Sequence, residues 1–249
     1  MNEKDWFVDW FDTSWYHRLY KKRNDKEAQS FIDHLVEYLG AKPKNNFMDL
    51  ACGKGRHSVY LAEKGFKVVG LDLSKESIKI AKEQETIDLQ FDVHDMRKIY
   101  GQAQFDYVLN LFTSFGYFKT DKEHVDVLIN MRTSLRDSES LLVLDFLNAD
   151  RVIADLCPKE VVKDGDTEYE ISREVVAGFI KKKIVVVEGV NKYAFSERVR
   201  LYNLDDFHRL FAQAGLQIVK VFGDYSLNEF DESSPRLILI GKADERMSL

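Results

Sequence analysis

Residues 47–74, FMDLACGKGRHSVYLAEKGFKVVGLDLS, form the stretch that most restricts how this chain can fold. An apolar run carries the acid Asp49, and two spaced glycines, Gly53 and Gly55, precede a helical pattern. A second apolar run then ends in another acid, Asp72. Strand, loop, helix and strand in this order predict a right-handed βαβ unit with parallel strands.

The alternation of strands and helices continues beyond this unit. It predicts an α/β fold with a doubly wound, mostly parallel sheet. The last two strands are joined by a loop too short for a crossover helix, so this pair should be antiparallel. We expect strands at 47–50, 67–71, 89–91, 105–111, 141–146, 216–222 and 237–240, and helices at 27–39, 56–64, 121–136 and 204–214. Ser74 and Asn203 are expected to cap the helices that follow them.

The sequence changes character after about residue 158. Residues 161–202 read as three successive strands with period-two polarity and no helix between them. We therefore expect a small antiparallel β insertion that serves as a lid or as the surface of a homodimer. The whole chain, 1–249, is expected to be one domain. Its predicted parts are an N-terminal helical cap (1–45), a Rossmann-like core (46–158 and 203–249) and the insertion (159–202).

Composition narrows the classes of partner. The formal net charge is −6 and the pI is about 5.6, which argues against a phosphate-binding basic face and so against nucleic acid. No apolar stretch approaches the roughly 18 residues of a membrane span. The two cysteines, Cys52 and Cys157, lack the spacing of a zinc site, so we expect no metal. These features predict a soluble protein of a reducing compartment, the cytoplasm.

The glycines and acids of 47–74 predict a ligand that contains a nucleoside. Gly53 and Gly55 allow a ligand to approach the backbone, and Asp72 can bind the hydroxyls of a ribose. A dinucleotide-binding loop wants a third glycine where this chain has Ser58, yet a nicotinamide-dependent oxidoreductase stays a possible interpretation. Asp49 suits a cationic ligand group better than a pyrophosphate. Alternatively, the glycines merely form a tight turn and Asp72 caps a helix.

Four motifs resemble those of the class I S-adenosylmethionine-dependent methyltransferases. They are MDLACGKGRHSVYLAEKG, in which Ala51 replaces a common glycine, VVGLDLS, DVHDM and FDYVLNLFTSFGYF. The resemblance covers residues 45–145 strongly and 201–241 more weakly. It implies a seven-stranded sheet with a reversed last strand, and S-adenosylmethionine as the cofactor. The alternative outside enzymology is a non-catalytic protein that binds this cofactor and acts as a partner subunit.

The resemblance also implies roles for individual residues. The first motif would hold the methionyl part of the cofactor, through Asp49, Ala51, Cys52, Gly53 and Gly55. In the second motif, Asp72 would hold the ribose, and Leu73 would lie beside the adenine together with Asp95 and Met96 of the third motif. The fourth motif would face the sulfonium through Asn110, Leu111 and Phe112.

The segment YHRLYKKRND resembles the N-terminus of a small-molecule branch of this family that includes sugar-amine N-methyltransferases. It implies that Tyr16, Tyr20 and Arg23 cover the cofactor, with Arg23 on the methionyl carboxylate. The two tyrosines could equally form a helix packing face, with Arg23 solvated. The stretch TSFGYF should border the acceptor through Ser114, Phe115 and Tyr117, and Tyr16 is expected at the same pocket. The implied function is methyl transfer to a small-molecule acceptor by in-line displacement, driven mainly by proximity and orientation, with no catalytic residue assigned.

Overall fold

A computed structural model describes residues 6–20 and 25–244 of the chain. Among the helices of these residues, none has the length and apolar character needed to cross a bilayer. The helices are α1 (Trp6–Trp10), α2 (Ser14–Leu19), α3 (Asp25–Tyr38), α4 (Arg56–Glu63), α5 (Lys75–Ala81), η1 (Lys82–Gln84), α6 (Asp121–Ser134), α7 (Ala149–Ala154) and α8 (Leu204–Gln213). The strands are β1 (Asn46–Leu50), β2 (Lys67–Asp72), β3 (Leu89–Val93), β4 (Tyr107–Asn110), β5 (Leu141–Leu147), β6 (Lys159–Asp164), β7 (Thr167–Val176), β8 (Phe179–Glu188), β9 (Asn191–Arg200), β10 (Leu216–Phe222) and β11 (Arg236–Ala243).

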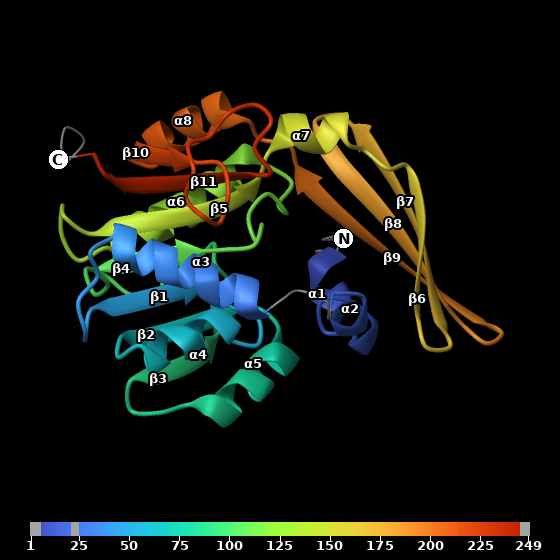
Figure 1. The fold of residues 1–249 in the computed structure, drawn as a ribbon, viewed down its shortest axis with the longest axis horizontal. Helices are drawn as coiled ribbons and strands as arrows, with labels where there is room; N and C mark the ends of the chain where they lie inside the picture. Colours follow the sequence, from blue (N-terminus) through green and yellow to red (C-terminus); the bar gives the residue numbers. More distant parts are fainter. Residues whose placement is uncertain (1–5, 21–24, 245–249) are drawn as a thin grey trace.

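Seven strands form one twisted sheet in the order β10-β11-β5-β4-β1-β2-β3 (Figure 1). The strands from β5 to β3 in this order pair in parallel. Strand β11 runs antiparallel to both of its neighbours, β10 and β5. The predicted mostly parallel sheet with a reversed last strand is therefore confirmed. The order reverses between β1 and β4, which is where ligands bind in open α/β sheets.

Helices cover both faces of this sheet, as near-continuous apolar strands require. On one face α3, α4 and α5 bury Phe31, Leu61 and Ile78. On the other face α6 and α8 bury Leu128 and Phe207. Ser74 and Asn203 cap α5 and α8 with their side chains, as the sequence predicted.

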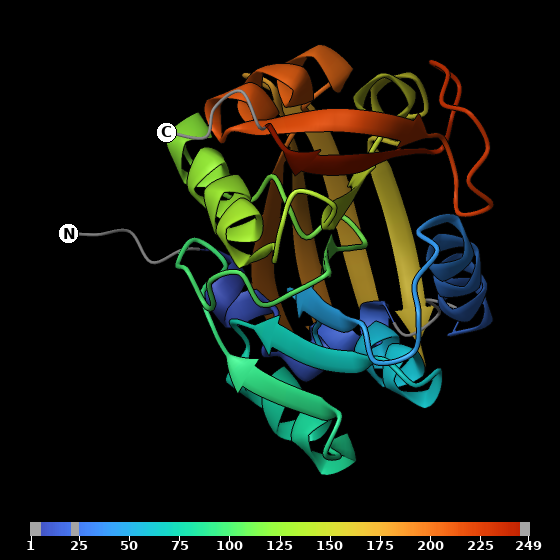
Figure 2. The same cartoon turned by 90° about the vertical axis from the view of Figure 1, so that its left-hand side faces the viewer.

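A second sheet, β6-β7-β8-β9, is antiparallel and stands beside the first (Figures 1 and 2). The predicted β insertion is confirmed, but it has four strands rather than three. The first of the three predicted strands, residues 161–176, lies in a hairpin, because Gly165 adopts a left-handed φ of 61° and turns the chain between β6 and β7. The inner face of this sheet packs on α1 and α2, around the buried side chains of Trp10, Tyr169 and Ile184.

Candidate functional site

A cavity of about 480 Å³ opens at the carboxyl ends of β1, β2 and β4. We name it the strand-end cavity. It brings together side chains from the four motifs and from the N-terminal segment, which are far apart in the sequence. The predicted site residues that line it are Tyr16, Tyr20, Asp49, Ala51, Cys52, Gly53, Asp72, Leu73, Asp95, Met96, Leu111, Phe112, Ser114 and Tyr117.

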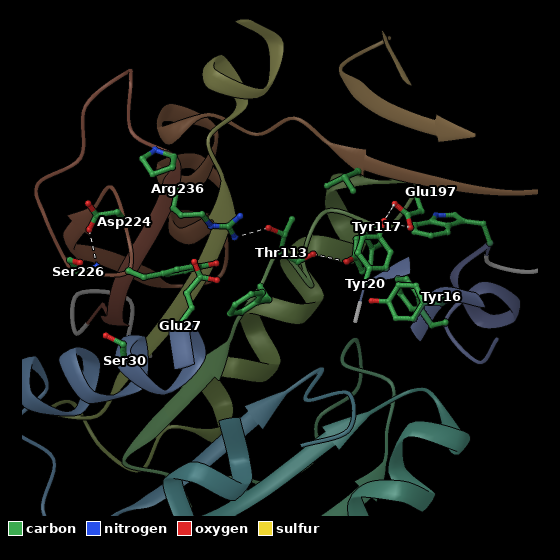
Figure 3. A pocket seen from close by; sticks show the side chains of 16 residues that line it. Tyr16, Tyr20, Glu27, Ser30, Thr113, Tyr117, Glu197, Asp224, Ser226 and Arg236 are labelled. Carbon is green, nitrogen blue, oxygen red and sulfur yellow. Dashed lines mark hydrogen bonds between the residues drawn. The ribbon is translucent and has the colours of Figure 1, made fainter. Parts of the chain in front are cut away.

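A second cavity, of about 720 Å³, lies between the two sheets; we name it the intersheet cavity. Figure 3 shows side chains converging on it from the N-terminal helices, α3, the turn after β4, β9 and the β10–β11 loop. It shares lining residues with the strand-end cavity, so the two adjoin. The shared residues are Phe11, Tyr16, Tyr20, Phe112 and Tyr117.

Asp49 places a carboxylate at the base of the strand-end cavity. The residue is 1% exposed, and Ser58 donates a 2.6 Å hydrogen bond to its Oδ2 atom. Burial raises the pKa of Asp49 to about 6, and the nearby charge of Asp72 acts in the same direction. Ser58, which occupies the position of the missing third glycine, is thus the hydrogen-bond partner of this acid. A buried carboxylate with a raised pKa is a favourable partner for a cationic ligand group.

Asp72 ends β2 and organises the turn beside the cavity. Its carboxylate accepts 2.8 Å hydrogen bonds from the backbone N–H groups of Gly53 and Ser74. Burial raises the pKa of Asp72, and these two hydrogen bonds act against the rise. The Ser74 hydroxyl also donates to Asp12, which ties the turn between α1 and α2 to this edge of the sheet. The N-terminal helices are therefore fastened directly beside Asp72.

Three predicted site residues do not line either cavity. Gly55 has a φ of 82°, and a Cβ on it would lie 2.5 Å from the ring of Phe91, so its missing side chain makes room for the core. Asn110 is fully buried and donates 2.8 Å to the backbone carbonyl of Leu50, while its Oδ1 atom has no partner among the described residues. Phe115 is also fully buried, in the core beneath α6 and α8.

Arg23, which was predicted to bind the methionyl carboxylate, lies outside the described residues.

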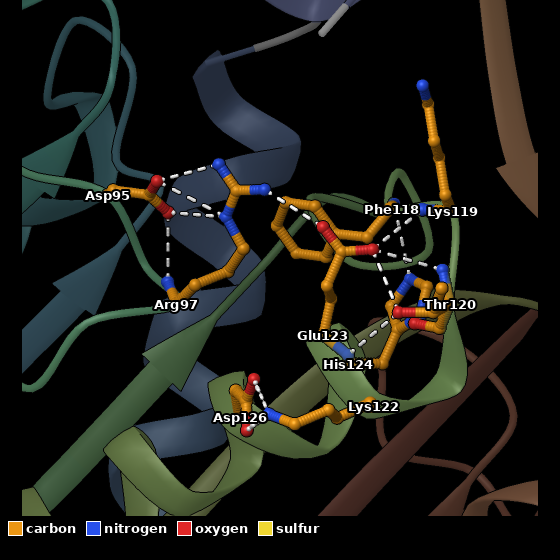
Figure 4. A network of polar contacts seen from close by, with 9 residues as sticks. All are labelled: Asp95, Arg97, Phe118, Lys119, Thr120, Lys122, Glu123, His124 and Asp126. Carbon is orange, nitrogen blue, oxygen red and sulfur yellow. Dashed lines mark hydrogen bonds and ion pairs between the residues drawn. The ribbon is translucent and has the colours of Figure 1, made fainter. Parts of the chain in front are cut away.

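Asp95 reaches the cavity but is already bound to Arg97 (Figure 4). The Nε and Nη2 atoms of Arg97 donate to its carboxylate at 3.0 and 2.7 Å, and Nη1 donates to Glu123 at 3.0 Å. Burial raises the pKa of Asp95, but the hydrogen bonds and charge of Arg97 outweigh burial and lower it. Asp95 is therefore ionised and held in place, and a ligand amino group would share it with Arg97.

Much of the intersheet cavity was not predicted from the sequence. Apart from Thr113, which begins the TSFGYF stretch, its unpredicted polar side chains come from segments with no ligand-binding motif, and nothing in their spacing relates them. The residues missed are Trp6, Phe11, Glu27, Ser30, Thr113, Glu197, Val199, Asp224, Tyr225, Ser226, Pro235 and Arg236. Two signals in the sequence were available. Arg236 lies inside the segment SPRLILIGKA, which resembles the last strand of the small-molecule branch, and Thr113 lies in the TSFGYF stretch.

Known proteins resemble this chain in sequence and in fold. Residues 47–138 match a family described as "Methyltransferase domain". A glycine/sarcosine N-methyltransferase of Aphanothece halophytica is 27% identical, over 96% of this chain and 90% of its own length. The dTDP-3-amino-3,4,6-trideoxy-alpha-D-glucopyranose N,N-dimethyltransferase of Streptomyces venezuelae is 23% identical, over 70% of this chain and 76% of its own. The crystal structure of an S-adenosylmethionine-dependent methyltransferase from Clostridium acetobutylicum ATCC 824 shares the fold, with a TM-score of 0.78 and 17% identity over 92% and 96% of the two chains.

Proposed function

We propose that the chain is a class I S-adenosylmethionine-dependent methyltransferase that methylates a nitrogen atom of a small-molecule amine. The match to a methyltransferase family argues against the alternative of a nicotinamide-dependent oxidoreductase. When bound, the cofactor supplies an activated methyl group, and the protein has to bind both partners, align them and exclude water. The observation that carries the proposal is the adjoining pair of cavities, which share a wall of aromatic side chains.

The strand-end cavity fits the methyl donor by its chemistry. Its buried Asp49 would hold the ammonium group of the methionyl part. Asp72 would hold the ribose hydroxyls, since its carboxylate lies at the carboxyl end of β2 and lines the cavity. Leu73 and Met96 offer apolar surface for the adenine. These assignments rest on residue types and positions that suit each part of the cofactor.

The intersheet cavity fits an amine acceptor. Its lining includes the aromatic side chains of Tyr16 and Tyr117, and aromatic rings attract a cationic or partly charged nitrogen. The ring of Tyr20 also lines it and has the ammonium group of Lys182 4.7 Å from its centroid. Glu27 and Glu197 add carboxylates to its lining. A volume of about 720 Å³ is in the range of cavities that enclose drug-sized ligands, so we expect an amino sugar to fill it better than glycine. The relatives named above as N-methyltransferases support the choice of nitrogen.

The test is the release of S-adenosylhomocysteine with amines of different size. We expect turnover with a 3-amino sugar nucleotide, slower turnover with glycine or sarcosine, and none with the matched sugar whose amine is a hydroxyl. Glu27→Gln should raise the KM for the amine about tenfold, because a carboxylate lining the acceptor cavity is lost. Glu37→Gln, at an exposed position on the same helix, is the control. Turnover of the hydroxyl compound alone would contradict methylation at nitrogen.

The pH dependence of cofactor binding tests the role of Asp49. In the free protein its pKa is raised to about 6, and an ammonium group bound against it would stabilise the ionised form. We therefore expect the affinity for S-adenosylhomocysteine to vary little around pH 7 and to fall by up to about tenfold per pH unit below pH 6. Titration calorimetry of the wild type and of Asp49→Asn measures this slope. The affinity of Asp49→Asn should keep only the weaker pH dependence contributed by Asp72. A slope equal to that of the wild type would show that Asp49 does not bind the cofactor.

Three further expectations stay predictions. They are a homodimer formed through the β6–β9 sheet, a cytoplasmic location and the organisation of residues 1–249 as one domain.

A further inference from the structure

The turn after β4 is held in a conformation that its residues disfavour. Phe112 and Thr113 are consecutive and have φ values of 61° and 58°, in the left-handed region. A bulky or β-branched side chain is a genuine outlier there, since the region normally belongs to glycine. Such strain persists only where the surrounding structure enforces it, and it gathers at functional sites. The turn therefore needs a partner that holds it.

Asp145 on β5 is that partner. Its side chain is fully buried, and its Oδ2 atom accepts a 2.8 Å hydrogen bond from the backbone N–H of Phe112. Its own backbone carbonyl accepts a 3.1 Å hydrogen bond from the N–H of Thr113. One residue thus fixes both strained amides.

Arg236 on β11 completes the arrangement. Its Nε and Nη2 atoms lie 2.8 and 2.7 Å from Oδ1 of Asp145. Nη2 also donates a 2.7 Å hydrogen bond to the hydroxyl of Thr113, a contact that Figure 3 shows. Burial lowers the pKa of Arg236, but the charge of Asp145 outweighs burial and raises it. Tyr225 donates 3.2 Å to the Asp145 carboxylate and stacks on Phe112 with ring centroids 5.3 Å apart. Both oxygens of Asp145 are thereby engaged.

The ring of Phe112 stands where the two cavities meet, and it lines both of them. Its other contacts include the guanidinium of Arg56, 4.0 Å from the ring centroid, and the ring of His57 at 5.1 Å. Thr113 lines the intersheet cavity directly after it. A shift of this turn would therefore move the wall between methyl donor and acceptor.

We infer that Asp145 and Arg236 are positioning residues for methyl transfer, which hold the strained Phe112–Thr113 turn so that donor and acceptor meet in line. The inference rests on the proposed function. A buried ion pair is by itself weak evidence for stability, because apolar side chains can often replace it. Apolar side chains could not accept the hydrogen bond from the backbone N–H of Phe112, and they could not donate one to the hydroxyl of Thr113. Misplacement by about 1 Å can slow an aligned reaction about 100-fold.

The first experiment uses Asp145→Asn in the full chain. We expect kcat for the amine to fall 30- to 100-fold while the Kd for S-adenosylhomocysteine changes less than threefold. Asp106→Asn is the matched control, because Asp106 also accepts a backbone amide (Asn46, 2.7 Å) and pairs with an arginine (Arg136, 3.1 Å) at the opposite end of the strands. The control should change the melting temperature but not kcat. An equal loss of kcat in both variants would overturn the inference.

Hydrogen exchange in the S-adenosylhomocysteine complex gives a readout that needs no acceptor. Asp145→Asn should speed exchange of the Phe112 and Thr113 amides at least tenfold, and Asp106→Asn should not. Unchanged exchange would overturn the inference. A wild type that binds S-adenosylhomocysteine but turns over no amine would instead contradict the proposed function, and the exchange result would then decide the role of Asp145 alone.

Discussion

Gly55→Ala should lower the free energy of unfolding by about 2–5 kcal/mol, without a direct contact to any ligand. Two effects add. The φ of 82° costs an L-residue about 1–2 kcal/mol, and overpacking a core typically costs about 1–3 kcal/mol. The new Cβ would lie 2.5 Å from the ring of Phe91, which is 1% exposed and cannot move into solvent. Denaturant unfolding of the unliganded protein measures the loss.

Gly53→Ala is the matched control for this prediction. Gly53 has a similar left-handed φ of 59°, but nothing lies within 4 Å of its hypothetical Cβ. Its free energy of unfolding should therefore fall only by the cost of the left-handed backbone conformation, about 1–2 kcal/mol. Adding Phe91→Leu to Gly55→Ala should recover part of the stability by making room for the methyl group. Equal losses for the two glycine variants would show that packing against Phe91 is not the reason for Gly55.

Asp72→Ala is expected to weaken the binding of S-adenosylhomocysteine by about 1–3 kcal/mol, or roughly 5- to 150-fold. The substitution removes the proposed ribose partner and leaves the N–H groups of Gly53 and Ser74 without their side-chain acceptor. The two N–H groups bind different carboxylate oxygens, so Asp72→Asn keeps an acceptor for one of them and should lose less than Asp72→Ala. Titration calorimetry measures both variants.

Asp88→Ala, an exposed acid in the turn before the neighbouring strand β3, serves as the control for Asp72→Ala. Its affinity should equal that of the wild type. If Asp72→Ala bound S-adenosylhomocysteine as tightly as the control, Asp72 would have no part in the site, and its role would be to shape the turn before α5.

The main sheet could be predicted because its signals are local. Continuous apolar runs, capping residues such as Ser74 and Asn203, and the short link before β11 each act within a few residues of the element they define. The hairpin at Gly165 was missed although the sequence carries a signal for it. Asp164 and Gly165 stand between two alternating runs, which is typical of a hairpin turn, and the three consecutive polar residues Asp164, Gly165 and Asp166 interrupt the alternation of a single strand.

Asn110, Phe115 and Gly55 show the limit of motif-based assignment. Each lies within a predicted ligand-binding stretch, yet the structure turns Asn110 toward the Leu50 carbonyl and buries Phe115 beneath α6 and α8. Adjacent residues in a strand or turn point in opposite directions. A motif therefore identifies the segment at a site, while packing decides which of its side chains reach the cavity.

The sequence by itself determined the order of elements and the class of fold, because these depend on apolar periodicity and on motifs within single βα units. It indicated the methyl donor through the resemblance of its motifs to those of a known family. Tertiary structure alone decided the acceptor side. One cavity is lined by Glu27 of α3, Glu197 of β9 and Arg236 of β11, because the tertiary fold places α3 and the two separate sheets around it. The strained turn at Phe112 is likewise held by Asp145, a residue 33 positions away. Contacts between distant segments carry no local pattern, since they arise only when the core excludes water and the strands pair.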